Sequence, residues 1–376
     1  MLLKFSTKKI IIGLAILIVL FAIVYLVYIF FFRVSTQTAS NEQEIINGTK
    51  KTQILFPLSQ EPVLSPTVNS SGSKIRYYSK NNGNIYEVNF DGTGLTRVSA
   101  ANLAGLLNII WSPDKEKVIG LFQKGDQIQK YLHNYQAGQS VLMNNNINQV
   151  AWSPDGKKIA VQTFNSDTQT STISISNADG TDLKDVFSTR LKDFVLDWPT
   201  IDKISLRTKP SGLSDGLVLS INPDNGTFSK VLGNIFGLNI KWSPLGNILI
   251  YSSTTIEGKN PSLFLADQTG QTKKALGLTT LVEKCSFSQD NRTLFCAVPQ
   301  KTSENAVWPD DYYKGMTTTA DNFAKIDLES GQTNILFSPD ANEKTYDATD
   351  LFLSPKEDYL FFTNRKDGLL YSLKLE

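Results

Sequence analysis

The chain has 376 residues, of which 41% are hydrophobic and 10% aromatic, a composition ordinary for a folded protein. Its 37 basic residues nearly balance its 36 acidic residues, and the net charge is +1. This balance provides no basic surface, so no nucleic-acid partner is expected. A sugar, a peptide or a protein surface remains open as a partner.

The N-terminus predicts a membrane anchor. Residues 1–9 are basic, and residues 10–32 contain no charged side chain. As a helix, the second stretch would be about 34 Å long, which is enough to cross a bilayer. A cleaved signal peptide usually has an apolar core of only about 7–15 residues, so a retained transmembrane helix is expected.

The charges around this helix predict its orientation. Three lysines lie within residues 1–9, while only Arg33 follows the helix closely. The positive-inside rule therefore predicts a single-pass protein of the plasma membrane, with a cytoplasmic N-terminus and an extracytoplasmic body. Residues 33–51 are polar and predict a flexible linker to that body, which spans residues 52–376.

The body repeats one motif seven times. Its clearest copies, at residues 111–114, 152–156 and 242–246, begin with Trp-Ser-Pro. The seven motif positions are Leu64, Trp111, Trp152, Trp198, Trp242, Phe287 and Leu353. The first six lie 41 to 47 residues apart. Periods of about 40–45 residues are typical of four-stranded propeller blades.

Each repeat has the strands and turn residues expected of one blade. An apolar strand ends at the motif position, the Ser-Pro cluster turns the chain, and an apolar run returns antiparallel. Glycines 27 or 28 residues after the motif position predict the turn into a fourth, outer strand. They are Gly92, Gly138, Gly180, Gly226 and Gly270.

The seventh repeat ends before such a turn and lacks its outer strand. Residues 52–56 resemble residues 333–337, the outer strand of repeat six, and are predicted to complete the last blade. This closure would remove free sheet edges. The predicted fold class is all-β, a seven-bladed β-propeller of four-stranded antiparallel blades with one N-terminal transmembrane helix.

The motif resembles the repeats of TolB-like and WD40-like β-propellers, whose blades open with an aromatic residue followed by Ser-Pro-Asp-Gly. The resemblance covers residues 52–376, and it departs from the pattern at residues 198–200, where the serine is absent. It implies an extracytoplasmic bacterial interaction module. The motif itself is blade scaffolding and specifies no ligand.

Few residues are candidates for chemistry. The repeated tryptophans could stack on sugars, but their fixed place in each repeat favours packing between blades. Ser214 lies in a Gly-x-Ser-x-Gly sequence, yet the only histidine, His133, precedes it and no helix is predicted after it, so no catalytic residue is assigned. Turn carboxylates such as Asp179 and Asp182 could bind calcium, although turn formation explains them. No metal site, no cofactor and no enzymatic activity are expected.

Two cysteines flank the inner hairpin of repeat six. If Phe287 pairs with Leu294, Cys285 faces Cys296 directly, at a separation that suits a disulfide. An extracytoplasmic, oxidising compartment agrees with this bond. Two free buried thiols, or a metal-binding or redox role for the pair, are the alternatives.

Repeat six also carries an insertion of about sixteen residues between its second and third strands. The candidate interaction residues there are Trp308, Asp310, Asp311, Tyr312 and Tyr313, because exposed Trp and Tyr dominate recognition hot spots. Alternatively, the insertion folds back over the channel mouth or over a neighbouring blade.

The predicted function is a non-catalytic, membrane-anchored module for protein-protein interaction or scaffolding, with an unknown envelope protein or glycan as partner. A receptor that binds a ligand or glycan in the central channel is the alternative, and a hydrolase or lyase using carboxylates at the channel mouth is a third. Charged or aromatic side chains gathered at one channel mouth would favour the second or third.

Overall fold

The computed structural model describes residues 54–99, 103–340 and 344–375. The predicted anchor at residues 10–32 and the linker at residues 33–51 lie outside these residues. Within the described part of the chain, no helix is long and apolar enough to cross a membrane.

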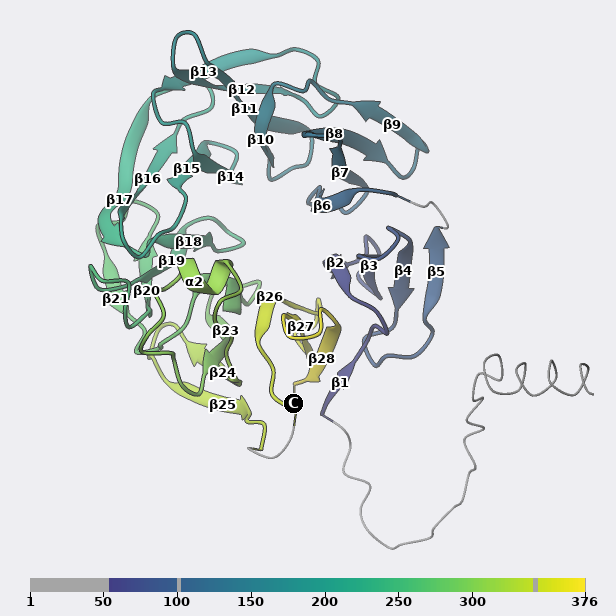
Figure 1. Cartoon of the computed structure of the whole chain (residues 1–376), viewed down its shortest axis with the longest axis vertical. Coiled ribbons are helices and arrows are strands. Elements are labelled where there is room, and N and C mark those ends of the chain that lie inside the picture. The colour runs from purple at the N-terminus through teal and green to yellow at the C-terminus, as the bar shows by residue number, and fades with distance from the viewer. Residues whose placement is uncertain (1–53, 100–102, 341–343, 376) are drawn as a thin grey trace, which may run out of the picture. The chain divides into compact units, whose positions relative to one another are not determined.

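Seven four-stranded antiparallel sheets form a closed ring (Figure 1). Blade one consists of β2 (Val63–Val68), β3 (Ile75–Ser79), β4 (Ile85–Val88) and β5 (Thr96–Ser99). Blade two consists of β6 (Leu106–Trp111), β7 (Lys117–Lys124), β8 (Gln127–Asn134) and β9 (Gln139–Leu142). Blade three consists of β10 (Ile147–Trp152), β11 (Lys158–Asn165), β12 (Thr170–Asn177) and β13 (Lys184–Thr189). Blade four consists of β14 (Phe194–Thr200), β15 (Lys203–Thr208), β16 (Asp215–Ile221) and β17 (Phe228–Phe236). Blade five consists of β18 (Asn239–Trp242), β19 (Ile248–Ser253), β20 (Ser262–Asp267) and β21 (Lys273–Ala275).

Blade six consists of β22 (Cys285–Phe287), β23 (Thr293–Pro299), β24 (Asp321–Asp327) and β25 (Thr333–Phe337). Blade seven consists of β26 (Ala348–Leu353), β27 (Tyr359–Asn364), β28 (Leu370–Lys374) and the early strand β1 (Leu55–Pro57). The predicted seven-bladed propeller is confirmed.

The ring closes through β1. This strand pairs antiparallel with β28, with Leu55 opposite Leu373 and Phe56 opposite Ser372. The predicted closing strand is therefore confirmed, although it begins later than residue 52. The outer edge of the last blade is covered in this way by the start of the body.

Local hydrogen bonds explain the repeated Ser-Pro-Asp-Gly turn. The Ser153 hydroxyl donates to the Lys158 carbonyl at 3.0 Å and accepts from the Lys158 amide at 2.9 Å. It also donates to the Asp155 carboxylate at 2.7 Å, and Gly156 has a φ of 67°. The motif thus joins the two inner strands of a blade, which is a structural task that each blade repeats.

The cores lie between adjacent blades, so strand two of each blade is buried on both faces. In β27, Leu360, Phe361 and Phe362 are all fully buried. The repeated tryptophans belong to these cores: the Trp152 indole N–H donates to the Ile110 carbonyl of the preceding blade at 3.2 Å, and Trp198 is also buried. Packing is therefore the role that the structure gives them.

Candidate functional site

The insertion of blade six crosses the face of the ring. It runs from β23 to β24 and contains the short helix α2 (Asp310–Tyr313), which Figure 1 shows in front of β18 and β19. The Trp308 amide donates to the Gly258 carbonyl of blade five at 2.7 Å. The Asp310 carboxylate accepts from the Ser211 hydroxyl and the Gly212 amide of blade four, at 3.0 and 2.7 Å. The insertion is thus bonded to two blades that precede its own.

The other side of the insertion is bonded to blade seven. The Tyr312 hydroxyl donates to Asp347 at 2.8 Å. The Arg365 guanidinium lies 3.8 Å from the centre of the Tyr312 ring and donates to the Tyr312 carbonyl at 2.8 Å. The insertion therefore links blades four to seven on one face.

These contacts correct the expected exposure of the candidate interaction residues. Trp308 and Tyr312 are each only 1% exposed and stack on each other, so they cannot form an exposed hot spot. The Asp310 carboxylate accepts from the Gly212 amide of blade four, and the Asp311 carboxylate accepts from the Val307 amide at 2.7 Å. Tyr313 is the only one of the five that is well exposed, at 41%. The insertion folds back on its neighbours, which is the alternative that the sequence left open.

A buried ion cluster lies beneath the insertion. The Lys284 ammonium donates to Asp321 and to Asp347, each at 2.8 Å, and to the Thr319 hydroxyl at 2.9 Å. The side chains of Lys284 and both aspartates are fully buried. Burial raises the pKa of Asp321 despite Lys284. Burial also acts on Asp347, but Lys284 and neighbouring hydroxyls outweigh it and lower the pKa of that carboxyl.

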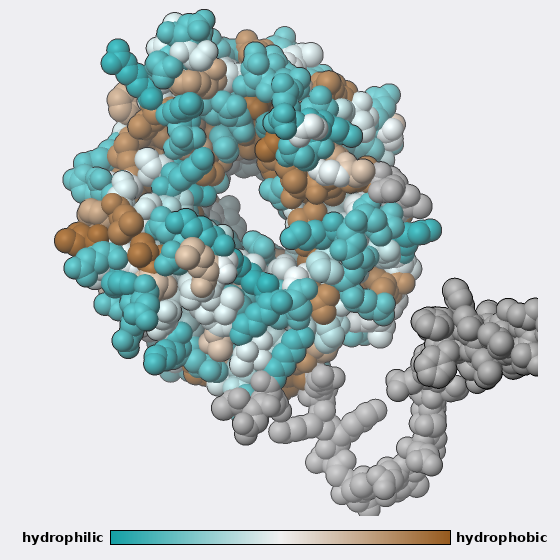
Figure 2. All heavy atoms as spheres, viewed as in Figure 1, coloured by the Kyte–Doolittle hydropathy of each residue, from teal (hydrophilic) through white to brown (hydrophobic). Residues whose placement is uncertain are grey.

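A polar cluster lies where the same face meets the central channel, which is open in Figure 2. It consists of Lys241 on β18, Glu283 in η1 (Val282–Lys284), Tyr313, Asp350 on β26 and Arg365, and is called the channel cluster below. Since β18 and β26 are the innermost strands of their blades, and η1 leads directly into the innermost strand β22, these groups come together around the channel. Asn239 links two of its parts, because its amide donates to the Tyr313 hydroxyl at 3.0 Å and to Glu283 at 3.4 Å.

The surrounding protein shifts the ionisation of this cluster. Burial lowers the pKa of Lys241, although Asp350 and Glu283 oppose the shift. Burial likewise raises the pKa of Glu283, and raises that of Asp350 against the effect of Lys241 and Arg365. Asp350 is nevertheless an exposed residue. Desolvation thus disfavours the charged forms of all three groups.

Two polar atoms of the channel cluster have no hydrogen-bond partner within the described part of the chain. They are Glu283 Oε1 and Arg365 Nη1, one acceptor and one donor. Unsatisfied buried groups are rare in folded proteins and call for an explanation, such as an absent ligand or a bound water. The cluster can therefore offer both donors and acceptors to a polar ligand.

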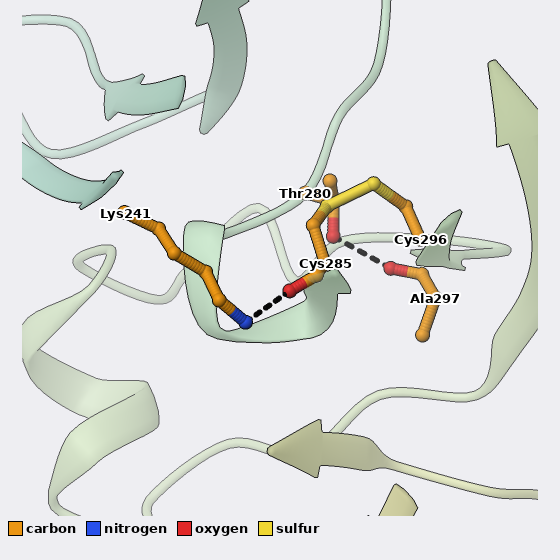
Figure 3. The surroundings of a disulfide bond; sticks show 5 residues. All are labelled: Lys241, Thr280, Cys285, Cys296 and Ala297. Atoms are coloured by element: carbon orange, nitrogen blue, oxygen red, sulfur yellow. Dashed lines mark hydrogen bonds between the residues drawn. A yellow bond between two sulfur atoms is a disulfide. The ribbon is translucent and has the colours of Figure 1, made fainter. Parts of the chain in front are cut away.

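A disulfide supports one wall of this site. Cys285 and Cys296 are bonded, with their Cα atoms 4.1 Å apart, and Phe287 pairs with Leu294 as predicted. Figure 3 shows the Lys241 side chain reaching the Cys285 carbonyl, to which it donates at 2.5 Å. The disulfide therefore fixes β22, whose Cys285 carbonyl accepts the hydrogen bond from Lys241.

A hollow of about 430 Å³ lies near the Trp-Ser-Pro turns of blades two to five. Trp152, Trp198 and Trp242 line it together with Asp197 and Lys241. Lys241 is thus shared by the hollow and the channel cluster. Indole surfaces beside a charged side chain are suited to a ligand with both apolar and polar faces.

The remaining candidates have structural roles. The Ser214 hydroxyl is exposed and donates to the Asp215 carbonyl at 3.4 Å, and Asp179 accepts from the Thr181 amide of its own turn at 3.0 Å. Among the described residues, no group of three or more His, Cys, Asp and Glu side chains could hold a metal ion.

No family model and no curated protein matches this sequence. Solved structures do match. An oligogalacturonate lyase in complex with manganese has a TM-score of 0.63 at 12% identity, covering 86% of this chain and 93% of its own. An oligogalacturonate lyase from Vibrio parahaemolyticus has a TM-score of 0.60 at 9% identity, covering 86% and 94%. The β-propeller domain of the Trilobed protease from Pyrococcus furiosus has a TM-score of 0.55 at 11% identity, covering 83% and 95%.

Two TolB structures, one described as putative, are also matched, with TM-scores of 0.41 and 0.39. At the identities of all these matches the likeness is one of fold, and a fold does not by itself name a function.

The sequence predicts a protein that is not an enzyme. The matches to two lyases contradict this prediction, because each is an enzyme whose fold is shared with most of this chain. The described residues contain no group of His, Cys, Asp and Glu side chains that could hold a metal ion such as the manganese of the first lyase.

Proposed function

We propose that this protein binds an acidic oligosaccharide in the central channel of its propeller, through the channel cluster. One observation carries the proposal: Glu283 Oε1 and Arg365 Nη1 are buried and unpaired within the described residues, next to Lys241 and Asp350 and near an open channel. A ligand with carboxylates and hydroxyls would satisfy both atoms once the two side chains turn toward it.

The chemistry of the cluster supports this class of ligand. Arg365 and Lys241 can pair with a sugar carboxylate, and guanidinium groups suit carboxylates through paired hydrogen bonds. Glu283, Asp350 and Tyr313 can accept from sugar hydroxyls. The names of the matched lyases mention an acidic oligosaccharide, oligogalacturonate, and this substrate class is carried to the present chain as part of the proposal.

A lyase is the second candidate. It is favoured by the shared fold and by Lys241, whose lowered pKa makes its neutral amine more available as a base. In an elimination, the amine would take a proton from a sugar carbon while the glycosidic oxygen leaves the adjacent carbon, and a carbon-carbon double bond would form between the two.

Calorimetric titration of the full chain in detergent with trigalacturonate, compared with neutral cellotriose, tests the binding proposal. We expect trigalacturonate to bind and cellotriose to bind at least about tenfold more weakly, because charge-assisted hydrogen bonds contribute roughly 1.5–3 kcal/mol. Lys241→Met should weaken trigalacturonate binding by about tenfold or more, whereas the exposed Lys366→Met should change it little.

Binding should also weaken as the pH rises. The pKa of Lys241 is lowered, so its ammonium group loses its proton at a lower pH than usual. The pKa values of Glu283 and Asp350 are raised, so these groups become negatively charged at a higher pH than usual. Both changes make the site less favourable for an anion, while Arg365 stays charged. Affinity that is independent of pH, or equal for the two lysine variants, would contradict the proposal. Ultraviolet absorbance from an unsaturated sugar product reports lyase activity separately.

The setting in the cell is also proposed. We infer that residues 10–32 anchor the protein in the plasma membrane and that the propeller is extracytoplasmic. The disulfide supports this, since such bonds persist in oxidising compartments. An envelope protein that contacts Tyr313 on the insertion face is compatible with a saccharide in the channel.

A further inference from the structure

Blade two lacks a side chain that every other blade has. In each blade, two alternate residues of strand two pack against the preceding blade, and the second of them is Gly120 in blade two. The residues at this position in blades one and three to seven are Tyr77, Val161, Leu206, Tyr251, Cys296 and Phe362, all buried in the cores between blades. The core between blades one and two therefore lacks one of its expected side chains.

Among the residues that the structure describes, the neighbours of Gly120 do not fill the missing volume. A pocket of about 590 Å³ lies between blades one and two, next to Gly120. In the described part of the chain, the buried core at this interface consists of Tyr78, Ile85, Ile109 and Val118, whereas three other interfaces hold eleven buried residues each. The volume lies within the range of about 300–1,000 Å³ typical of small-molecule sites.

The walls of this pocket combine aromatic and aliphatic side chains. Its aromatic lining residues are Tyr78, Phe122, Tyr131, His133 and Tyr135. The polar atoms of these rings are largely used within the protein: the Tyr78 and Tyr135 hydroxyls are hydrogen-bonded to each other, and His133 Nδ1 lies 2.9 Å from the Ser140 hydroxyl. The pocket thus presents ring faces and edges to an occupant.

Lys124 gives the pocket an end of distinct polarity. It is the one lysine or arginine in the lining, it is exposed, and no ion pair involving it is found among the described residues. An occupant with an aromatic body and a carboxylate can place its rings among the aromatic side chains and its charge beside Lys124. Exposed ion pairs contribute little energy, so Lys124 would orient the ligand more than hold it.

We propose that the pocket between blades one and two is a binding site for a small aromatic carboxylate. Blades one and two lie across the ring from blade five, as Figure 1 shows, and no residue of the channel cluster lines the pocket. The site is therefore separate from the channel cluster, and its occupancy does not depend on saccharide binding.

Titration of the full chain with 2-naphthoate, 2-naphthol and decanoate tests this site. We expect 2-naphthoate to bind, 2-naphthol to bind about threefold more weakly because it lacks the carboxylate, and decanoate to bind more weakly than either because it has no ring. Tighter binding of decanoate, or no binding of 2-naphthoate, would overturn the proposal.

Two variants locate the ligand. Gly120→Val restores the side chain that blade three has and should weaken 2-naphthoate binding by about tenfold or more. The added Cβ would lie 2.7 Å from a ring carbon of Phe122, so that ring must turn, and it would turn within the pocket. Unchanged affinity in this variant would place the ligand elsewhere.

Lys124→Met tests the same site without any repacking of the interior. It should reduce 2-naphthoate affinity by about threefold and leave 2-naphthol affinity unchanged. The exposed Lys273→Met on blade five is the matched control and should affect neither ligand. Equal losses for the acid and the alcohol would show that Lys124 does not contact the carboxylate.

Discussion

At the scale of single residues, burial decides what each charged or aromatic side chain does. Lys284 is fully buried and is stable there because two carboxylates, a hydroxyl and the Ala348 carbonyl accept from its ammonium. Tyr312 extends the same network through Asp347. This cluster holds the insertion against blades six and seven, so residues that resemble a recognition surface in sequence are part of an interior.

Replacing Lys284 by Met should destabilise the protein strongly. The change leaves Asp321 and Asp347 buried without their cation, and breaking a buried pair in this way costs about 3–5 kcal/mol. The loss should shrink as the pH falls, because in the variant Lys284 no longer opposes the effect of burial on the two carboxyl groups, and their protonation removes the buried charge. Denaturant unfolding measures the effect, with the exposed Lys273→Met as control. A loss no larger than that of the control would contradict the structural role of the cluster.

At the scale of elements, the inner hairpin of blade six differs from the others by its covalent bond. Cys285 and Cys296 occupy directly opposed positions of β22 and β23. Thr280 adds a second connection, since its hydroxyl donates to the Ala297 carbonyl at 2.7 Å (Figure 3). The hairpin that carries Lys241's acceptor and follows Glu283 is thus held more firmly than hydrogen bonds alone would hold it.

Replacing both cysteines by serine should lower the free energy of unfolding by about 2–3 kcal/mol. The two cysteines are 11 residues apart, and closing a short loop of that length restricts the unfolded chain by this amount. Reductant should destabilise the wild type and leave the double variant unaffected. Two alkylatable thiols in freshly isolated, unreduced protein would show that the bond does not form.

At the scale of the whole molecule, ring closure sets where the chain enters the propeller. Strand β1 pairs with β28, so the first described residues lie beside the C-terminal strand. Blades four to seven are further linked by the insertion, whereas the interface of blades one and two contains a pocket. Blades four to seven are therefore linked by additional contacts, whereas the interface between blades one and two is less tightly packed.

Membrane attachment belongs to this scale as well. The full chain should remain with membranes after an alkaline wash, because residues 10–32 are long and apolar enough to span a bilayer. A chain that starts at residue 33 should appear in the soluble fraction. In intact cells, an added protease should reach the propeller and leave a cytoplasmic control protein uncut. Release of the full chain by the wash would contradict the anchor.

The sequence by itself determined the architecture. Turn motifs such as Trp152-Ser153-Pro154 are local, their hydrogen bonds close within a few residues, and their repetition reveals seven blades and the incomplete last one. The disulfide was predictable for the same reason, because the register of one hairpin places Cys285 opposite Cys296.

Only the tertiary structure decided which side chains meet across blades. Trp308 and Tyr312 are buried by residues of blades that are distant in the sequence, and the channel cluster joins Lys241, Glu283 and Asp350 from three blades. Gly120 is visible in the aligned repeats, but whether neighbouring rings fill the gap depends on how the blades pack. Exposure and cavities follow from contacts between distant segments, and a repeat pattern does not encode them.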